Sequence, residues 1–554
     1  AYEGDCNARM PAIRDIYRRY WERCRQADAM DFDDLLLYTF LLFRDKPEVL
    51  ARYQQQFGYV LVDEYQDTNY AQHCIVLQLS KQHQRVCVVG DDAQSIYSFR
   101  GADIDNILYF TKVYPDTKVF KLEQNYRSTQ TIVCAANSLI AKNQRQIRKE
   151  VFSEKERGEA LGVFQAYSDI EEADIVVNKI IELRRREQLK YSDYAILYRT
   201  NAQSRVFEEA MRKRSIPYRI YGGLSFYQRK EVKDVIAYFR LVVNPNDEEA
   251  FKRIINYPAR GIGDTTLGKI VAAASDYGVS LWTVLQEPLA YGLNFNKGVT
   301  AKLQAFKTLM LGFMNDSLTK NAAEMGQDII QRAGIMNEVC QDNTPENLSR
   351  KENIEELVNG MGDFCAQRLE EGDTNITLTD YLSEVSLLTD QDSDDDSEEK
   401  VTLMTVHAAK GLEFPVVFVV GLEEELFPSA MCIDSMRAIE EERRLFYVAI
   451  TRAERHCFLS YAKSRMRYGK MEFAAPSRFL KDIDVRYLRL PGQMAYTQRE
   501  EPRAPVFTKI QPEAKPTFTP SSPRNLKPVA AAAATASSQN VELSVGQYIE
   551  HERF

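Results

Sequence analysis

The alternation of apolar and polar positions predicts an α/β protein in which short buried strands end in polar turns. Apolar runs that fit strands span residues 58–62, 85–89, 118–123, 194–198, 401–406, 416–420 and 456–460. The first run, 58–62, is rich in β-branched residues and typical of a strand buried on both faces of a parallel sheet. Ligand sites in such sheets lie off the carboxyl ends of the strands, so we expect the chemistry in the turns.

Other stretches lack this alternation of apolar strands and polar turns. Residues 1–57 and about 226–395 have helical patterns, and the second stretch reads as an inserted domain. The acidic run 390–399 is expected to be a flexible connector at the end of that insertion. From residue 486 the chain is rich in Pro, Ala, Ser, Thr and Gln, which predicts a disordered linker to residue 540. Residues 541–554 are expected to begin a further small module, with a strand at 545–549.

Composition narrows the class of protein. With 554 residues, 44% of them hydrophobic and 27% charged, several globular domains are expected. Nine scattered cysteines without a C-x-x-C pair argue against a disulfide framework or a zinc site, and for a reducing, cytoplasmic setting. No apolar run approaches the length of a membrane span. The net charge is −9, so any nucleic-acid site must be a local feature.

The first strand ends in two adjacent carboxylates, Asp63 and Glu64. One carboxylate at that position can hold Mg²⁺ and its waters, while the other orients or deprotonates the water that attacks a γ-phosphate. This is the Walker B interpretation. The alternative is a strand that happens to end in acidic residues, which is common in loops.

The turn after the second strand adds further candidates. Gln94 can hydrogen-bond both a γ-phosphate and the attacking water. Behind it, Tyr97, Phe99 and Arg100 offer rings and a guanidinium that can stack on bases and hold phosphates. The alternative for each aromatic residue taken alone is a place in the core.

Later turns repeat the arrangement. Tyr126 and Arg127 follow the 118–123 run and suit a nucleobase and a phosphate, and the turn at 199–205 carries several donors for a nucleic-acid backbone. Inside the insertion, Gly261-Ile262-Gly263 fits a hairpin whose glycines let backbone N–H groups approach phosphates. The adjoining 263–270 segment imitates a P-loop, but it has Ile270 where Ser or Thr must bind Mg²⁺, and no strand precedes it. We therefore reject it.

In order and spacing, these motifs resemble those of the UvrD/PcrA/Rep family of superfamily 1 DNA helicases, over residues 1 to about 485. Residues 61–69, 89–102, 124–129, 402–414 and 440–454 resemble family motifs II, III, IV, V and VI. The resemblance implies RecA-like parallel-sheet domains, one of them incomplete, with helical insertion domains. Its expected boundaries are 1–57 for the end of insertion 1B, 58–112 for the second half of domain 1A, 113–225 and 396–485 for domain 2A, and 226–395 for insertion 2B.

The resemblance also implies residue roles. Asp63 would serve Mg²⁺ through water, Glu64 would be the catalytic base, and Gln94 would sense the γ-phosphate. Arg127 and Arg452 would be arginine fingers, and the nucleotide would also meet Tyr126 at adenine, Glu413 at ribose, and Gly411. The residues expected to bind DNA are Tyr97, Phe99, Arg100, Arg199, Asn201 and His407 on the single strand, and Gly261, Ile262 and Gly263 on the duplex.

The implied activity is that of an ATP-dependent 3′-to-5′ single-stranded DNA translocase and helicase in DNA repair or replication. Its cofactors would be ATP and Mg²⁺. Its partners would be single-stranded DNA, junctions with duplex, and repair or transcription proteins at the C-terminal module, with no membrane involved.

Two departures from the family pattern matter. Phe99 stands where the family usually has tryptophan, and the printed sequence contains no Walker A loop. We therefore expect a fragment of a longer protein that cannot hydrolyse ATP productively by itself. Two other interpretations stay open: a non-catalytic DNA-binding or protein-docking piece, and a helicase–nuclease of the RecB or AddA type, which would need a C-terminal nuclease domain.

Overall fold

The computed structural model describes residues 11–342, 344–390, 399–467 and 470–491. The chain divides into two compact units, residues 1–498 and 499–554, and all described residues belong to the first. Its centre is a seven-stranded sheet in the order β13-β5-β10-β9-β6-β8-β7, with every pairing parallel. The strands are β5 (Leu161–Ala166), β6 (Tyr194–Tyr198), β7 (Tyr218–Ile220), β8 (Val401–Thr405), β9 (Phe414–Val419), β10 (Ala453–Ala462) and β13 (Leu488–Arg489).

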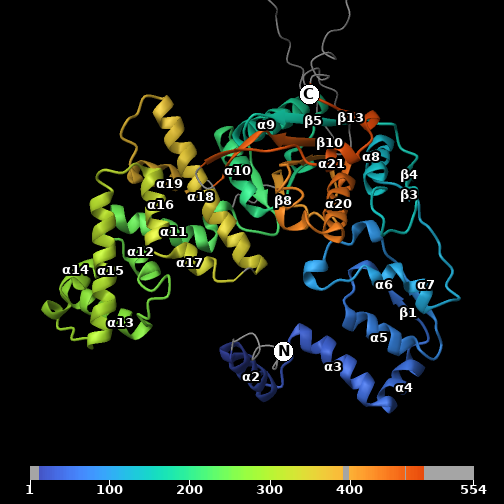
Figure 1. Cartoon of the computed structure of the whole chain (residues 1–554), viewed down its shortest axis with the longest axis horizontal. Helices are drawn as coiled ribbons and strands as arrows, with labels where there is room; N and C mark the ends of the chain where they lie inside the picture. The colour runs from blue at the N-terminus through green and yellow to red at the C-terminus, as the bar shows by residue number, and fades with distance from the viewer. Residues whose placement is uncertain (1–10, 343, 391–398, 468–469, 492–554) are drawn as a thin grey trace, which may run out of the picture. The chain divides into compact units, whose positions relative to one another are not determined.

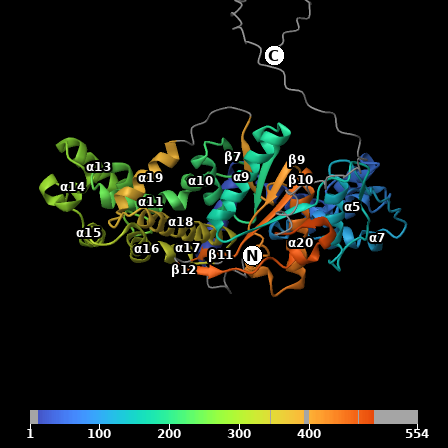
Figure 2. The same ribbon diagram turned by 90° about the horizontal axis from the view of Figure 1, so that it is seen from above.

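Helices cover both faces of this sheet, as the strand sequences require. Along β6, Tyr194, Ile196 and Tyr198 pack with α9 (Asp169–Glu187) and α10 (Ser204–Lys213). The alternate residues Ala195 and Leu197 pack on the other side with α8 (Gln130–Ile140) and α20 (Met436–Thr451). Figure 2 shows α9 and α10 on one side of the strands and α20 on the other. The α/β fold class and the strands predicted at 194–198, 401–406 and 416–420 are confirmed, and these three strands are buried on both faces.

A group of helices with its own core lies within residues 226–390 (Figure 1). The helices are α11 (Lys230–Val243), α12 (Glu248–Ile254), α13 (Asp264–Tyr277), α14 (Leu281–Gln286), α15 (Lys297–Asp316), α16 (Ala322–Arg332), α17 (Ile335–Val339), α18 (Pro345–Glu370) and α19 (Leu378–Asp390). This agrees with the helical pattern seen in the sequence. The limits of the individual domains stay predictions. Among the described helices, none is long and apolar enough to cross a membrane.

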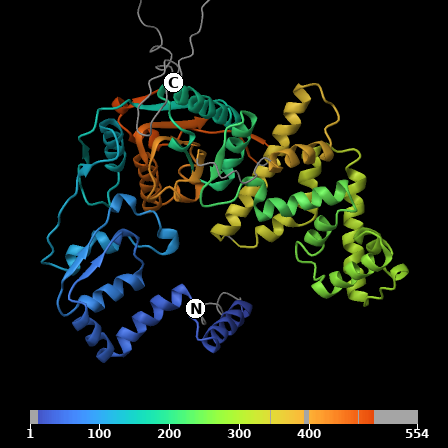
Figure 3. The same ribbon diagram turned by 180° about the vertical axis from the view of Figure 1, so that it is seen from behind.

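The N-terminal part of the described chain holds a second, much smaller parallel sheet of two strands, β1 (Val60–Val62) and β2 (Val86–Val88). The helices around it in sequence are α2 (Pro11–Gln26), α3 (Phe32–Asp45), α4 (Pro47–Gln56), α5 (Tyr70–Ser80), α6 (Asp105–Leu108) and α7 (Phe110–Val113) (Figure 3). Burial on both faces, predicted for the first of these strands, is wrong, and the second strand is also open on one face. Leu61 is 76% exposed and Cys87 is also exposed, because only the opposite face packs on the small core around Tyr65 and Ile107.

Two further predictions need correction. The strand predicted at 118–123 does not form; the only strand there is the two-residue β3 (Gln124–Asn125), paired with β4 (Phe152–Ser153), and Phe120 and Leu122 are exposed. The linker predicted from residue 486 starts too early, because β13 joins the edge of the large sheet beside β5. The predicted connector at 391–398, the remainder of the linker and the C-terminal module lie outside the described residues.

Candidate functional site

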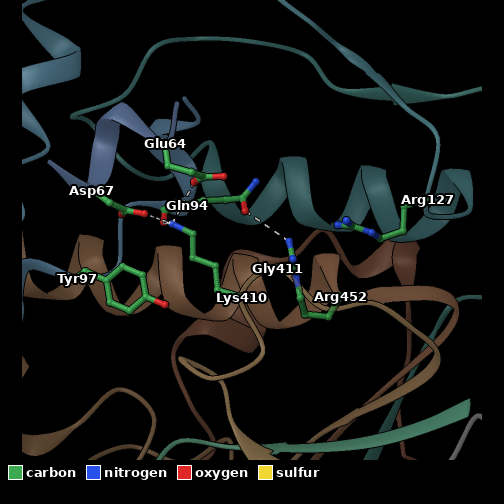
Figure 4. Close-up of a pocket in the computed structure, with 8 residues that line it drawn as sticks. All are labelled: Glu64, Asp67, Gln94, Tyr97, Arg127, Lys410, Gly411 and Arg452. Carbon is green, nitrogen blue, oxygen red and sulfur yellow. Dashed lines mark hydrogen bonds and ion pairs between the residues drawn. The ribbon is translucent and has the colours of Figure 1, made fainter. Parts of the chain in front are cut away.

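Polar side chains from the turns after β1, β2, β3 and β8, together with the end of α20, line an open cavity of about 450 Å³ (Figure 4). The lining residues are Glu64, Asp67, Gln94, Tyr97, Arg127, Lys410, Gly411 and Arg452. Six of these eight are residues that the sequence pattern or the family resemblance singled out. The cavity therefore brings together segments more than 300 residues apart in the chain.

A buried glutamine fixes the acidic turn after β1. Gln66 is fully buried, and its side-chain amide donates to Oε2 of Glu64 at 2.6 Å. Its Oε1 accepts from the backbone N–H of Asp91 at 3.0 Å, which ties the turn after β1 to the turn after β2. Gly90 permits this contact, since a Cβ there would lie 2.4 Å from Oε1 of Gln66. Glu64 has a left-handed backbone with φ 49° and points into the cavity (Figure 4).

Gln94 lies where the two halves of the cavity meet. Its Nε2 donates to Oδ2 of Asp91 at 2.8 Å, so the orientation of the amide is fixed. Its Oε1 faces the guanidinium of Arg452, with Nη2 at 3.5 Å (Figure 4). A side chain held in this way presents both a donor and an acceptor edge to the space beside Glu64.

Arg452, just after α20, is a buried cation without a carboxylate partner. It is 2% exposed and donates to the carbonyl oxygens of Val448 at 3.1 Å and Leu412 at 3.2 Å. Within the described part of the chain no ion pair includes it, and burial, helped by the nearby charge of Arg127, lowers the pKa of Arg452 to about 10. Buried guanidinium groups are usually paired. This one is suited to an anion that enters the cavity.

Arg127 supplies the second guanidinium and is held by Glu413. Its Nε donates to Oε2 of Glu413 at 2.5 Å, and its Nη1 donates to the carbonyl oxygen of Thr451 at 3.3 Å. Next to it, Tyr126 is 76% exposed, and its hydroxyl donates to Gln124 at 3.0 Å. The exposed ring offers a face to a planar ligand beside the two arginines.

Two lining residues, Asp67 and Lys410, had no assigned role in the sequence analysis. Nζ of Lys410 donates to Oδ2 of Asp67 at 2.5 Å and to the carbonyl oxygen of Gln94 at 2.9 Å, and it lies 3.5 Å from Oε2 of Glu64. Both residues stand in motif segments that the sequence made conspicuous. Their pairing was missed because it joins two turns that only the folded chain brings together.

The carboxylates of the site fit a hydrated Mg²⁺ better than a metal held by protein alone. Asp63 is exposed just outside the cavity, and its Oδ1 accepts the backbone N–H of Glu64 at 2.9 Å. In the described residues no cluster of three or more His, Cys, Asp or Glu side chains forms a metal centre. Mg²⁺ commonly takes one or two carboxylates and completes its shell with water and substrate phosphates. The donor set suits that arrangement.

A row of rings begins at the cavity wall. Tyr97 lines the cavity, its ring lies 6.1 Å from that of Phe99, and Phe99 meets His407 edge-on at 5.3 Å. The guanidinium of Arg100 lies over Phe99 at 5.4 Å. Burial, with the charges of Arg199 and Arg100, lowers the pKa of His407 to about 3, so its ring is neutral at physiological pH. Phe99 and Arg100 are exposed and can stack on bases.

Family models match almost the whole described chain. Residues 3–115 match the UvrD/REP helicase N-terminal domain, and residues 120–464 match the UvrD-like helicase C-terminal domain. The chain belongs to the UvrD-like helicase family.

Curated relatives agree with this assignment. The chain is similar to proteins named ATP-dependent DNA helicase PcrA. It is 41% identical to that of Bacillus subtilis (strain 168) over 514 residues, which is 92% of this chain and 68% of the relative. It is 41% identical to that of Staphylococcus aureus (strain Mu50 / ATCC 700699) over 500 residues, 90% of this chain and 67% of the relative. It is 40% identical to that of Leuconostoc citreum over 483 residues, which is 87% of this chain and 64% of the relative. The chain thus spans about two thirds of the length of these relatives.

Within this UvrD-like chain, the other residues expected to bind DNA lie in mixed surroundings. Arg199 donates to both carboxylate oxygens of Glu442, at 2.8 to 3.1 Å, so its guanidinium is already engaged inside the protein. Asn201 is exposed at the start of the next turn. Both roles stay predictions. In this conformation the Arg199 guanidinium is engaged by Glu442, whereas Asn201 is exposed.

The predicted duplex contact at 261–263 of the UvrD-like chain stays a prediction. Gly261 and Gly263 are exposed, but Ile262 is 2% exposed in the helical core, and its N–H donates to Oδ1 of Asn256 at 3.0 Å. Ile262 therefore anchors the loop and cannot touch DNA through its side chain in this conformation. The rejected P-loop imitation forms the start of α13, where Ile270 is fully buried.

Proposed function

We propose that this chain carries the motor core of an ATP-dependent DNA helicase that moves 3′ to 5′ along single-stranded DNA. The observation that supports this most is the composition of the cavity. One wall carries the carboxylates Glu64 and Asp67 from the turn after β1, and the opposite wall carries the guanidinium groups of Arg127, after β3, and of Arg452, after α20. Opposed acidic and cationic walls suit phosphoryl transfer to water, where positioning and charge stabilisation supply most of the catalysis.

The residues of the chain take distinct roles in this proposal. Glu64 accepts a proton from the attacking water, and Gln94, held by Asp91, orients that water. Arg127 and Arg452 stabilise the charge that develops on the phosphoryl oxygens. Tyr126 stacks on the adenine ring, Gly411 and Glu413 contact the nucleotide, and Asp63 holds Mg²⁺ through water. ATP with Mg²⁺, when bound, supplies the phosphoryl group whose transfer releases free energy.

Tyr97 connects this chemistry to DNA. It lines the cavity and begins the row of rings that includes Phe99 and His407. A change in the spacing of the two cavity walls therefore moves one end of the row. Stacking is worth about 1–3 kcal/mol per base, so a change of grip on one base is enough to bias the direction of stepping.

The proposal covers a protein of the relatives' length rather than this chain alone. The printed sequence has no phosphate-binding loop with Ser or Thr after its lysine. We infer that this chain, as written, binds DNA but does not turn over ATP, and that the longer protein acts in repair or replication. ATPase turnover by this exact chain with single-stranded DNA would contradict that inference.

The decisive experiment uses Arg452→Ala in the longer protein. Removing an arginine finger is expected to lower the rate of DNA-stimulated ATP hydrolysis by roughly 10³-fold or more. Arg437→Ala, in the first turn of the helix that Arg452 follows, is the matched control, because Arg437 lies away from the cavity in an exposed pair with Asp103. A loss below tenfold for Arg452→Ala, or an equal loss in both variants, counts against the proposal. Unwinding of duplexes with a 3′ tail but not a 5′ tail tests the direction.

A further inference from the structure

Lys149 is not among the residues that line the cavity, yet it contacts the turn that carries Gln94. It lies in the segment 141–151, which joins α8 to β4. Its Nζ donates to Oδ1 of Asp92 at 3.0 Å and to Oδ1 of Asp91, both in the turn after β2. The side chain of Lys149 is 20% exposed and that of Asp92 only 4%. A mostly buried ammonium group thus joins the segment 141–151 to the turn after β2.

Asp91 connects Lys149 to the cavity. Its Oδ1 accepts from the lysine and from the backbone N–H of Ala93, and its Oδ2 accepts from Nε2 of Gln94 at 2.8 Å. Among the described residues no other group accepts from Nε2 of Gln94. On the other edge of the same amide, Oε1 faces Nη2 of Arg452 at 3.5 Å (Figure 4). The direction of the Gln94 amide therefore depends on where the Asp91 carboxylate is held.

Two adjacent carboxylates would not keep this arrangement by themselves. Asp91 and Asp92 both direct an oxygen at Nζ of Lys149, and like charges this close repel each other unless a cation lies between them. Burial lowers the pKa of Lys149, but the charges of the two aspartates outweigh burial and raise it overall, so the ammonium form persists. In the described part of the chain neither aspartate forms another ion pair. Lys149 therefore supplies the charge that keeps the two carboxylates together.

We propose that Lys149 is a positioning residue, which holds the carboxylate of Asp91 and through it fixes the amide of Gln94 with its oxygen towards Arg452. Without the ammonium group the two aspartates move apart, and Nε2 of Gln94 loses its acceptor. The segment 141–151 thereby contributes to the reaction from outside the cavity. The effect on ATP turnover rests on the proposed function, whereas the hold on Gln94 does not.

The hold on Gln94 is testable on this chain without nucleotide, by NMR of protein labelled with ¹⁵N in the glutamine side chains. The signal pair that disappears in Gln94→Ala belongs to the Gln94 amide. We expect Lys149→Met to move this pair to the position of a solvated amide and to speed its exchange with water by about tenfold. Lys142→Met, at an exposed lysine of the same segment, is the matched control and should leave the pair unmoved. An unmoved pair in folded Lys149→Met overturns the proposal.

A second variant separates the charge of Lys149 from its packing. Adding Asp92→Asn to Lys149→Met removes the charge that repels Asp91, so the Gln94 pair should return to its wild-type position. This double variant also serves should Lys149→Met alone fold poorly, because it no longer leaves two carboxylates without a cation. A Gln94 pair that stays at the solvated position in the folded double variant overturns the proposal.

The effect on turnover is measured in the longer protein as kcat and KM for DNA-stimulated ATP hydrolysis. We expect Lys149→Met to lower kcat by roughly 10- to 100-fold, with KM for ATP and the affinity for oligothymidylate within about twofold of the wild type. In a Gln94→Ala background the same change should cost less than about twofold, because it acts through Gln94. An unchanged kcat, or an equal loss in that background, overturns the role in turnover. Absence of DNA-stimulated hydrolysis in the wild-type longer protein means that the proposed function fails, whereas the NMR result stands by itself.

Discussion

The turns after β1 and β9 both place glutamates behind an apolar strand, but the two sets lie in opposite surroundings. Glu423, after β9, is fully buried and accepts from Nε of Arg465 at 2.6 Å and from the N–H of Ala462 at 2.7 Å. The side chain of Glu64, after β1, is 64% exposed and lines the cavity. The large sheet is covered on both faces, so its acid becomes part of the core. The small sheet leaves its acid open to a ligand. The same sequence pattern thus serves structure in one region and a candidate site in the other.

The strongest test of this comparison changes one residue at each of the two acidic sites and measures both activity and stability. Glu64→Gln in the longer protein is expected to lower DNA-stimulated ATP hydrolysis by roughly 10²–10⁴-fold, the usual contribution of a general base, with an unchanged melting temperature. Arg465→Met strips the cation from Glu423 and Glu172 and is expected to cost roughly 3–5 kcal/mol of unfolding free energy. ATPase rates and denaturant melts of both variants measure this. A destabilised Glu64→Gln or a fully stable Arg465→Met would show that the two regions are not distinct.

Shortening one apolar residue in each sheet sharpens the comparison. Ile196 in β6 is fully buried, so Ile196→Ala is expected to lower the unfolding free energy by roughly 2–5 kcal/mol. Leu61 in β1 is mostly exposed, so Leu61→Ala is expected to change it by less than about 0.5 kcal/mol. Urea unfolding followed by circular dichroism gives both values. Similar losses would mean that the outer face of the small sheet is covered in solution.

The last expected effect depends on pH and concerns His407, where the two regions meet. Burial and the charges of Arg199 and Arg100 lower its pKa from 6.5 to about 3, so between these values the unfolded chain binds a proton that the folded chain rejects. Stability from this residue is therefore complete above pH 6.5 and is lost as the pH falls towards 3, by at most about 1.4 kcal/mol per pH unit. His407→Gln should lose less stability than the wild type between pH 7 and pH 5 in denaturant melts. If both proteins lose the same stability, the folded protein accepts a proton on His407 in this pH range, which contradicts the prediction.

The central sheet was predictable from sequence because its strands are buried on both faces. Runs such as 194–198 are apolar at every position, and a short run of this kind favours a strand covered on both faces. The strand expected at 118–123 shows where this reasoning fails. Val119, Phe120 and Leu122 are apolar but exposed, so the run lacks the packing partners that would have made it a strand.

The candidate site was predictable in part. Glu64, Gln94 and Arg127 were chosen from the turns after predicted strands and Arg452 through the family resemblance, and the fold brings all four to one cavity, although their roles stay predictions. Gln66, Asp67 and Lys410 were missed because their importance depends on which turns meet in space. A buried amide bridging two turns and a lysine reaching across from another sheet leave no periodic signal in the sequence.

The open face of the small sheet has a consequence for handling the protein. Both of its strands are edge strands, and Tyr59, Leu61 and Val89 put apolar surface beside them. Unpaired strand edges next to apolar side chains are templates for pairing with another chain. For this chain taken alone, we therefore expect intermolecular pairing to begin at β1 and β2 rather than at the covered large sheet.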